Sequence, residues 1–380
     1  MAYLKLDQQK LKHNFNFLEG LFSKNNISWG VVSKLLCGTE SYLNELVELG
    51  IKEIHDSRIS NLQKIKELDP TVQTVYIKPP ARRSIKEIVK YADVSFNTEL
   101  ETMKLLSEEA ARQNKKHKVI IMIEMGDLRE GVMGEDLLDF YESVFRLPNI
   151  FIVGLGTNLN CLHGIMPSED KLVQLSLYKQ IIELKFKREI PWVSGGTSVV
   201  LPLLLQNRLP KGINHFRIGE ALFFGLDLFT GQTIPGMEDG LFTLHAEIIE
   251  ISQKPAVPFG ETGTNPSGEE TEIDPNLYGK EQLRAIIDVG LLDIQPKFLR
   301  PVDKSIETIG ASSDMLILNI THSENSYKVG DTIAFDLDYM GALTLMNSFY
   351  VEKRIKKGTR IKKLHRDDKT EAPSKSLATK

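Results

Sequence analysis

The feature that most constrains the fold is a repeated alternation of short β-rich runs with longer stretches whose apolar residues have helical spacing. The β-rich runs are ISWGVVSK (27–34), KEIHD (52–56), TVYIK (74–78), DVSFN (93–97), KVIIMIEMG (118–126), IFIVGLGTN (150–158), WVSGG (192–196) and HFRIGEALF (215–223). Eight such runs separated by helices over roughly 200 residues predict a (β/α)8 TIM-type barrel. A doubly wound open sheet is the alternative, because periodicity does not reveal whether a sheet closes.

The sequence pattern changes after about Gly236. Strand-like segments such as FTLHAEIIEIS, RAIIDVG, MLILNIT and DTIAFDLDY follow one another with turns between them and no long helix. A Pro/Gly-rich acidic stretch at 255–275 is predicted to be a loop. We therefore expect a barrel over residues 8–235 and a C-terminal all-β domain over 236–353.

Composition indicates a cytoplasmic protein. No apolar run approaches the roughly 18 residues of a membrane span, and the start of the chain has no signal-peptide core. Only two cysteines, Cys37 and Cys161, occur in 380 residues, so a disulfide framework is not expected. We expect neither a membrane partner nor a metal ion.

The C-terminal tail reverses the charge of the rest of the chain. Lys353–Lys380 contains eleven lysines and arginines and three acidic residues, although the whole chain has a net charge of −4. Basic tails can bind nucleic acid. This one has no aromatic residue and follows an acidic body, so we interpret residues 354–380 as a solvated, disordered tail and expect no nucleic-acid partner.

Polar and glycine-rich residues follow several of the predicted barrel strands. In a (β/α)8 barrel the carboxyl ends of the strands form the active-site rim. The segments expected there are Ser33–Lys34, Gly126–Arg129, Thr157–Cys161, Ser194–Ser198 and Arg217–Glu220. Together they could bind a phosphate-bearing ligand through backbone N–H groups and hydroxyls.

Each of these residues also has a structural interpretation. A lysine such as Lys34 after a strand is commonly a surface residue; burial at the barrel mouth would instead favour the uncharged amine that attacks carbonyl groups. Gly195, Gly196 and Gly219 can be turn residues. The functional hypothesis depends on their combination with Thr197 and Ser198.

Several segments together resemble the alanine racemase family of pyridoxal 5′-phosphate (PLP) enzymes, in particular its alanine/ornithine racemase branch. The matching pieces are VVSKLLCG, DSRISNL, VSFNTELETMKLL, EMGDLREGV, GLGTNLNC, SGGTSVVL, GINHFRIGEAL and GASSDMLILNIT, which extend from about Tyr3 to Lys353. The resemblance implies a PLP-binding barrel and a β-domain that residues 1–7 join. It also implies a homodimer whose active sites lie at the subunit interface.

The resemblance assigns roles to individual residues. Lys34 matches the lysine that carries PLP, and Arg129 matches an arginine near the cofactor and the substrate carboxylate. Ser313 and Asp314 match a pair supplied by the partner subunit. The remaining cofactor-binding residues that the resemblance implies are Asn158, Ser198, Arg217, Gly219, Glu220 and Tyr339.

Arg217 matches the arginine that faces the pyridine nitrogen. Arginine stays protonated and only donates hydrogen bonds, so it favours an unprotonated ring nitrogen. The cofactor is then a weaker electron acceptor, which favours return of the proton over side reactions such as transamination. This suits a racemase.

Two residues depart from the alanine racemase pattern. Leu291 stands where the family has its second acid/base, a tyrosine, and leucine cannot transfer a proton. Met122 stands where several alanine racemases have a lysine. Both changes argue against an ordinary alanine racemase.

A different group must therefore supply the second proton. We rank Cys161 first, because a thiol lies at the end of the sixth strand, then His163 and then Asp293. Each of these also has an ordinary structural interpretation, such as a buried thiol or a surface loop histidine.

The leading hypothesis is a PLP-dependent racemase that interconverts the enantiomers of a free amino acid, ornithine being the best single choice. Asp293 or Glu220 could contact a distal ammonium group. The alternatives are a D-hydroxyamino-acid aldolase or lyase and a non-catalytic PLP-binding homeostasis protein. The predicted β-domain argues against the last.

Overall fold

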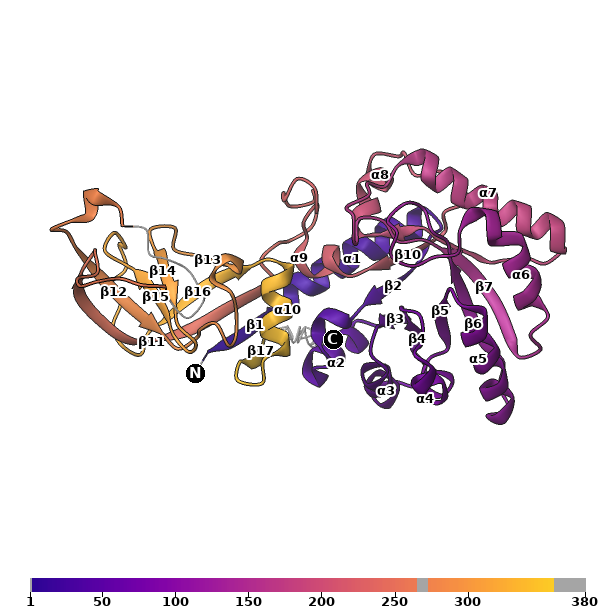
Figure 1. Ribbon diagram of the computed structural model, residues 1–380, viewed down its shortest axis with the longest axis horizontal. Coiled ribbons are helices and arrows are strands. Elements are labelled where there is room, and N and C mark those ends of the chain that lie inside the picture. The colour runs from indigo at the N-terminus through magenta and orange to yellow at the C-terminus, as the bar shows by residue number, and fades with distance from the viewer. Residues whose placement is uncertain (1, 265–272, 359–380) are drawn as a thin grey trace, which may run out of the picture.

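Two β-sheets, one in each half of the molecule, organise the described part of the chain (Figure 1). The structure is a computed structural model that describes residues 2–264 and 273–358. The parallel sheet lies at the right of Figure 1 among helices, and the second sheet lies at the left.

The parallel sheet forms the predicted barrel. Its strands follow in the order β8-β7-β6-β5-β4-β3-β2-β10-β9. The two end strands, β8 and β9, are consecutive pieces of one segment interrupted at Gly195, so the sheet closes on itself. The strands are β2 (Ser28–Val32), β3 (Glu53–Asp56), β4 (Gln73–Tyr76), β5 (Val94–Asn97), β6 (His117–Met122), β7 (Ile150–Gly156), β8 (Trp192–Ser194), β9 (Gly196–Thr197) and β10 (His215–Ile218). The (β/α)8 prediction is confirmed, and the open-sheet alternative is wrong.

Helices connect the strands around the barrel. Helix α1 (Gln8–Lys24) begins at Asp7, whose carboxylate accepts hydrogen bonds from the backbone N–H groups of Gln9 and Lys10. Its buried face includes Leu11, Leu18 and Phe22. The other barrel helices are α2 (Glu40–Glu48), α3 (Ile59–Leu68), α4 (Ile85–Tyr91), α5 (Leu100–Arg112), α6 (Leu137–Phe145), α7 (Glu169–Phe186), α8 (Leu201–Leu205) and α9 (Glu220–Phe224).

The predicted strand at 215–223 is wrong in its second half. β10 ends at Ile218, and Glu220–Phe224 forms helix α9. Gly219 separates the two, and Gly225 ends the helix with φ of +67°. The run IGEALF is apolar enough to be read as a buried strand, and apolarity alone does not distinguish a buried strand from a short buried helix.

The second sheet is mainly antiparallel and has the order β13-β16-β11-β12-β15-β14. The N-terminal strand β1 (Tyr3–Asp7) pairs with β11 and, in parallel, with β17. The strands are β11 (Phe242–Pro255), β12 (Glu281–Ile287), β13 (Leu299–Pro301), β14 (Glu307–Ala311), β15 (Leu316–Asn319), β16 (Thr332–Leu337) and β17 (Glu352–Lys356). The prediction of a C-terminal β-domain is confirmed.

One helix interrupts the region that was expected to be all β. Helix α10 (Tyr339–Asn347) begins at Asp338, whose carboxylate accepts a hydrogen bond from the N–H of Gly341. It lies against the short 3-10 helix Lys34–Leu36 after β2, so the second half of the molecule contacts the barrel rim.

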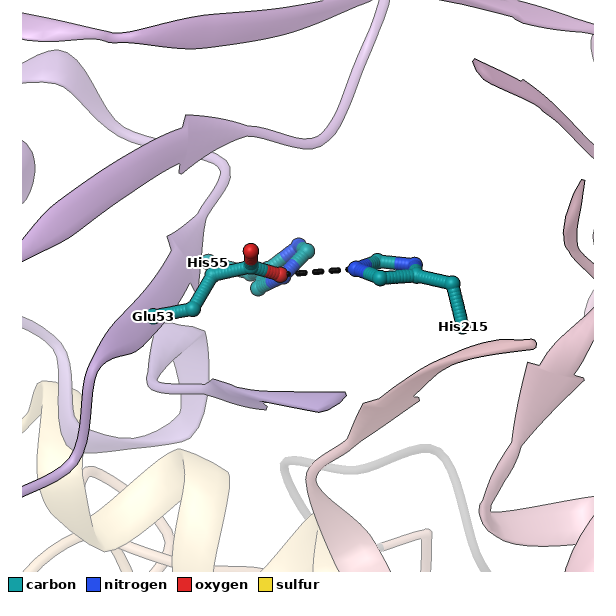
Figure 2. Close-up of side chains that lie close together, drawn as sticks. All are labelled: Glu53, His55 and His215. Carbon is teal, nitrogen blue, oxygen red and sulfur yellow. Dashed lines mark hydrogen bonds and ion pairs between the residues drawn. The ribbon is translucent and has the colours of Figure 1, made fainter. Parts of the chain in front are cut away.

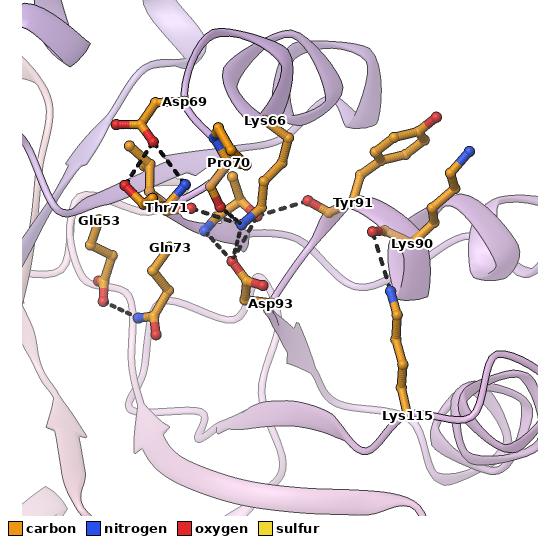
Figure 3. A network of polar contacts seen from close by, with 12 residues as sticks. Glu53, Lys66, Asp69, Pro70, Thr71, Gln73, Lys90, Tyr91, Asp93 and Lys115 are labelled. Atoms are coloured by element: carbon orange, nitrogen blue, oxygen red, sulfur yellow. Dashed lines mark hydrogen bonds and ion pairs between the residues drawn. The ribbon is translucent and has the colours of Figure 1, made fainter.

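A polar network holds the amino ends of two neighbouring barrel strands (Figure 3). The Asp93 carboxylate accepts hydrogen bonds from Lys66 Nζ at 2.7 Å and from the backbone N–H of Thr74 at 2.9 Å. The Thr74 hydroxyl donates to the carbonyl of Tyr91. These contacts join α3, β4 and the start of β5 at the end of the barrel opposite the strands' carboxyl ends.

Two predictions fall partly outside the described residues. Part of the loop predicted at 255–275 lies there, at 265–272, and most of the predicted tail lies there, at 359–380. β17 extends to Lys356, so the predicted tail boundary at residue 354 falls inside a strand. Among the described helices, none combines the length and apolarity that crossing a membrane requires.

Candidate active site

A cavity of about 590 Å³ opens at the carboxyl ends of the barrel strands. Its wall contains nine of the residues selected from the sequence: Lys34, Arg129, Asn158, Cys161, Ser198, Arg217, Gly219, Glu220 and Tyr339. They come from segments spread over more than 300 residues of sequence, and the barrel brings them together because its parallel strands end at one rim.

Lys34 lies at the start of the 3-10 helix that follows β2. The preceding residue, Ser33, is buried and donates a hydrogen bond to Asp56 Oδ2 at 2.8 Å, which fixes the end of β2 against β3. The Lys34 side chain is exposed in the chain considered alone. The burial that the sequence analysis considered for this lysine is therefore absent in the single chain.

Arg217 is the buried cation of the site. Its side chain projects from β10, only 4% of the residue is exposed, and its guanidinium donates to Ser194 Oγ at 2.7 Å. It also donates to the Thr157 carbonyl at 2.7 Å and to Asn158 Oδ1 at 2.9 Å. Burial lowers the pKa of Arg217 to about 10, so the guanidinium remains protonated at neutral pH. The Phe96 ring lies 5.4 Å from its Cζ atom.

Glu130 joins this network and was missed by the sequence analysis. Its Oε1 atom accepts hydrogen bonds from Asn158 Nδ2 and from an Arg129 nitrogen, each at 2.5 Å. The hydrogen bonds that Arg129 donates to Glu130 raise the pKa of Arg129. Arg217, Asn158, Glu130 and Arg129 thus form one connected row of charged and polar groups. The sequence feature that could have identified Glu130 as a site residue is its position directly after Arg129 in the GDLREG segment.

Ser198, Gly219, Glu220 and Tyr339 also line the cavity. Ser198 is buried, and its Oγ accepts a hydrogen bond from the N–H of Ala221 at 3.1 Å. Burial raises the pKa of Glu220 to about 6, although the Lys34 charge opposes that shift. Burial also raises the pKa of Tyr339 to about 12.

Close packing accounts for the paired glycines at 195 and 196. A Cβ atom on Gly196 would lie 2.2 Å from the Phe216 ring, so only glycine lets β9 approach β10. A Cβ atom on Gly195 would meet side chains of α7 at 3.0–3.2 Å. Neither glycine lines the cavity.

The three candidate second bases occupy different environments. Cys161 is exposed and lines the cavity. His163 is also exposed but is absent from the cavity wall, and its Nδ1 lies 2.8 Å from the Asp127 carbonyl oxygen. Asp293 lies in the β-domain, where its carboxylate accepts a hydrogen bond from Ser348 Oγ at 2.7 Å.

The residues expected to serve the partner subunit lie away from this chain's own cavity. Ser313 and Asp314 are exposed on the turn between β14 and β15. Leu291 and Leu292 are held beside that turn, since the N–H of Leu292 donates to the Ser313 carbonyl at 2.9 Å. Met122 is fully buried in the barrel interior.

One group of potential metal ligands occurs among the described residues. Glu53, His55 and His215 are buried inside the barrel, and their ligand-type atoms all lie within 4.8 Å of one another (Figure 2). The Glu53 Oε1 atom lies 2.5 Å from His55 Nε2 and 2.8 Å from His215 Nε2. These are hydrogen-bond distances.

Comparison with known proteins identifies relatives over most of the chain. Residues 6–227 match the family described as alanine racemase, N-terminal domain. Ornithine racemase of Acetoanaerobium sticklandii is 36% identical over 93% of this chain and 99% of its own length. Lysine racemase of Thermotoga maritima is 32% identical over 92% of this chain and 97% of its own length. The structure of alanine racemase from Bartonella henselae with covalently bound pyridoxal phosphate has a TM-score of 0.72 at 14% identity, covering 93% of this chain and 99% of that chain.

Proposed function

This chain belongs to the alanine racemase family and is an amino-acid racemase, and from this premise we propose that it racemises ornithine with PLP held by Lys34. The observation that carries the substrate proposal is the full-length similarity to relatives named for ornithine and lysine. Both of these amino acids have a distal amino group that alanine lacks. The departures Leu291 and Met122 agree with a substrate other than alanine.

The residues of the cavity fit PLP. The cofactor needs an amine for its aldehyde, donors for its phosphate and a partner for its ring nitrogen. Lys34 would supply the amine, and buried Arg217, which only donates hydrogen bonds, would be the partner of the ring nitrogen. Ser198 Oγ accepts from the N–H of Ala221, so its hydroxyl proton would be available to the phosphate, as would the backbone N–H groups of Gly219 and Glu220 at the start of α9.

When bound, PLP makes the Cα proton of an amino acid acidic by drawing the electron pair of the C–H bond toward its ring. Lys34 Nζ removes or returns the proton on its own side of Cα. Arg129 attracts the substrate carboxylate, and its ion pair with Glu130 holds its side chain at the cavity wall. Racemisation also requires a proton donor on the opposite side of Cα.

We assign that second donor to Cys161 ahead of His163 and Asp293. The Cys161 thiol lines the cavity, whereas the His163 ring is turned to the Asp127 carbonyl. Backbone N–H groups of Cys161 and Leu162 donate to Asp127 Oδ2, and this fixes the loop that carries the thiol. Asp293 is not among the residues of the cavity wall.

Glu220 is our candidate for contact with the distal ammonium group of ornithine. Its carboxylate lines the cavity together with Lys34, whereas Asp293 is hydrogen-bonded to Ser348 in the β-domain. A partly buried carboxylate beside an amine-bearing substrate gives a charge-assisted hydrogen bond that alanine cannot form.

The function is tested by a substrate panel and by trapping of the cofactor. Purified protein with PLP is incubated with L-ornithine, L-lysine, L-alanine and D-threonine, and chirality and carbon–carbon cleavage are followed. We expect ornithine to racemise fastest. Cleavage of D-threonine without racemisation would instead identify an aldolase, and PLP binding without any turnover would identify a carrier.

Borohydride reduction should attach PLP to Lys34, and a labelled peptide around any other lysine would refute the cofactor assignment. Replacement of Glu220 by glutamine should lower kcat/KM for ornithine about tenfold more than for alanine, because alanine has no distal group to lose. Asp293→Asn is the matched control. Equal losses for both substrates in Glu220→Gln would remove Glu220 from substrate recognition.

A further inference from the structure

A buried row of hydrogen bonds links Arg217 to a carboxylate at the other end of the barrel. Alternate residues of a strand point to the same face, so His215 and Arg217 of β10 both project into the barrel interior, as do Glu53 and His55 of β3. Both histidine side chains are 0% exposed and the Glu53 side chain is 9% exposed. Figure 2 shows His215 and Glu53 meeting across the interior.

The chemistry of Arg217, which only donates, and of Glu53, which only accepts, fixes the direction of the two end bonds. An ionised carboxylate only accepts hydrogen bonds, so His215 donates from Nε2 to Glu53 Oε1 at 2.8 Å. We assign His215 the tautomer in which Nδ1 carries no proton, so that Nδ1 accepts from Ser194 Oγ at 2.6 Å. Ser194 Oγ in turn accepts from Arg217 at 2.7 Å. Every proton in the row points from the arginine toward the glutamate.

Glu53 is an anion that accepts hydrogen bonds from three side chains. His55 Nε2 also donates to Oε1, at 2.5 Å, and Gln73 Nε2 donates to Oε2 at 2.5 Å. Burial acts to raise the pKa of Glu53, but the interactions with His215 and His55 outweigh it and hold that pKa below the usual range. Burial lowers the pKa of His55, which leaves its imidazole neutral. The row therefore has one negative end and one positive end.

The surrounding packing holds this row in one arrangement. The Trp192 ring stacks on His215 with 4.5 Å between ring centroids and 15° between planes. A Cβ atom on Gly30 would lie 2.4 Å from His55 Nε2, so glycine at that position leaves room for the imidazole. Glu53 and Gln73 also line a second cavity, of about 610 Å³, at the amino ends of the strands. The row thus spans the barrel between two cavities.

We propose that Glu53 and His215 are positioning residues that act through Ser194 to orient Arg217 and balance its charge against the cofactor ring. The inference rests on the proposed function, since Arg217 has its role only beside PLP. A buried cation without a counter-charge is costly; Glu130 supplies one counter-charge through Asn158, and Glu53 supplies a second through His215 and Ser194. Hydrogen bonds of 2.5 and 2.8 Å fill the space between the ligand-type atoms, so the group forms this relay in preference to a metal site.

Two matched substitutions distinguish the effect of breaking the relay from the effect of disturbing the barrel packing. Glutamine places its amide nitrogen near the position of histidine Nε2, so His215→Gln and His55→Gln both keep a donor for Glu53. Only His215→Gln removes the acceptor of the Ser194 hydroxyl, because His55 Nδ1 has no hydrogen-bond partner within the described part of the chain. Both changes affect fully buried side chains, and similar losses of unfolding free energy are expected.

The first measurement uses the protein without cofactor. Nitrogen NMR of histidine-labelled protein should show His215 and His55 protonated at Nε2, and Ser194→Ala should move the Nδ1 resonance of His215 but not that of His55. The second measurement uses PLP. His215→Gln should shift the absorption maximum of bound PLP and lower kcat about tenfold with little change in KM, whereas His55→Gln should leave the spectrum and kcat within about twofold of wild type.

Several results would overturn the relay. The first is an active wild type in which His215→Gln and His55→Gln have the same spectrum and kcat. The second is a stoichiometric metal ion in the purified protein that either substitution removes. A wild type that neither binds PLP nor racemises an amino acid would instead overturn the proposed function, and the relay with it. If His215→Gln does not fold, Ser194→Ala decides the question, because it removes no donor from Glu53.

Discussion

The proposed role of Cys161 as the second base can be tested separately from the roles of Lys34 and His163. Removal of a second base should slow proton abstraction from one enantiomer only, since Lys34 continues to exchange the proton on its own side. In deuterated solvent, Cys161→Ala should therefore slow α-proton exchange of one enantiomer of ornithine at least tenfold while exchange of the other persists.

His163→Ala is the matched control for Cys161, because it lies on the same loop with its ring held by the Asp127 carbonyl. We expect both of its exchange rates to remain close to wild type. Unchanged exchange in Cys161→Ala, His163→Ala and Asp293→Asn alike would eliminate all three candidates.

Glu220 predicts a pH dependence of stability. Its folded pKa of about 6 lies above the ordinary value of 4.5, because burial disfavours the carboxylate. The folded chain therefore loses stability as pH rises from 4.5 through 6, and Glu220→Gln should remove that loss. We expect the variant without cofactor to gain up to about 2 kcal/mol over wild type above pH 7 and nothing below pH 4. Urea unfolding at both pH values measures this, and equal gains at both would contradict it.

At the scale of single residues, the sequence could select cavity residues but not their partners. Lys34, Ser198 and Arg217 were selected because they lie at or near the ends of predicted strands and match the family's segments, and parallel strands end at one rim. Glu130 and the row from Ser194 to Glu53 were missed, since their contacts join residues up to 162 positions apart. No local spacing reports such contacts.

Among the secondary-structure elements, helix α1 depends on a residue that three segments share. The Asp7 carboxylate caps α1 and accepts a hydrogen bond from Lys356 Nζ of β17 at 2.9 Å. Asp7→Ala should lower the free energy of unfolding by about 1–2 kcal/mol, because a helix cap is lost. Asp7→Asn retains the cap and should lose much less. Denaturant midpoints compare the two, and equal losses would show that the ion pair outweighs the cap.

Element boundaries were predictable where periodicity and turn signals agree. The eight barrel strands were placed to within a few residues because each is a short apolar run before a helix. Helix α9 was assigned to a strand, and α10 was not expected, because both are short and apolar and depend on tertiary packing. Closure of the barrel was also beyond periodicity, since it depends on β9 pairing with β10.

For the whole molecule, the proposed homodimer predicts complementation between two inactive variants. Lys34→Ala loses the cofactor lysine, and Asp314→Ala loses a residue assigned to the partner's cavity, so each homodimer should be inactive. Mixed dimers contain one intact site, and an equal mixture that exchanges subunits should recover about a quarter of the wild-type rate. Sedimentation should show a dimer at assay concentration. Failure to recover activity despite subunit exchange would place Asp314 outside the site.

The pairing of β1 with β11 and β17 has a consequence for synthesis of the chain. Tyr3–Asp7 is made before its sheet partners, which begin only at Phe242 and Glu352. At a synthesis rate of about 5–20 residues per second, β1 remains unpaired for roughly ten seconds or more. Its residues Leu4 and Leu6 are fully buried in the folded protein. The barrel can close during that interval, whereas the second sheet cannot. A nascent chain halted before residue 242 should therefore expose the apolar residues of β1, which chaperones can bind. Synthesis of β17 should then allow β1 to pair and become buried.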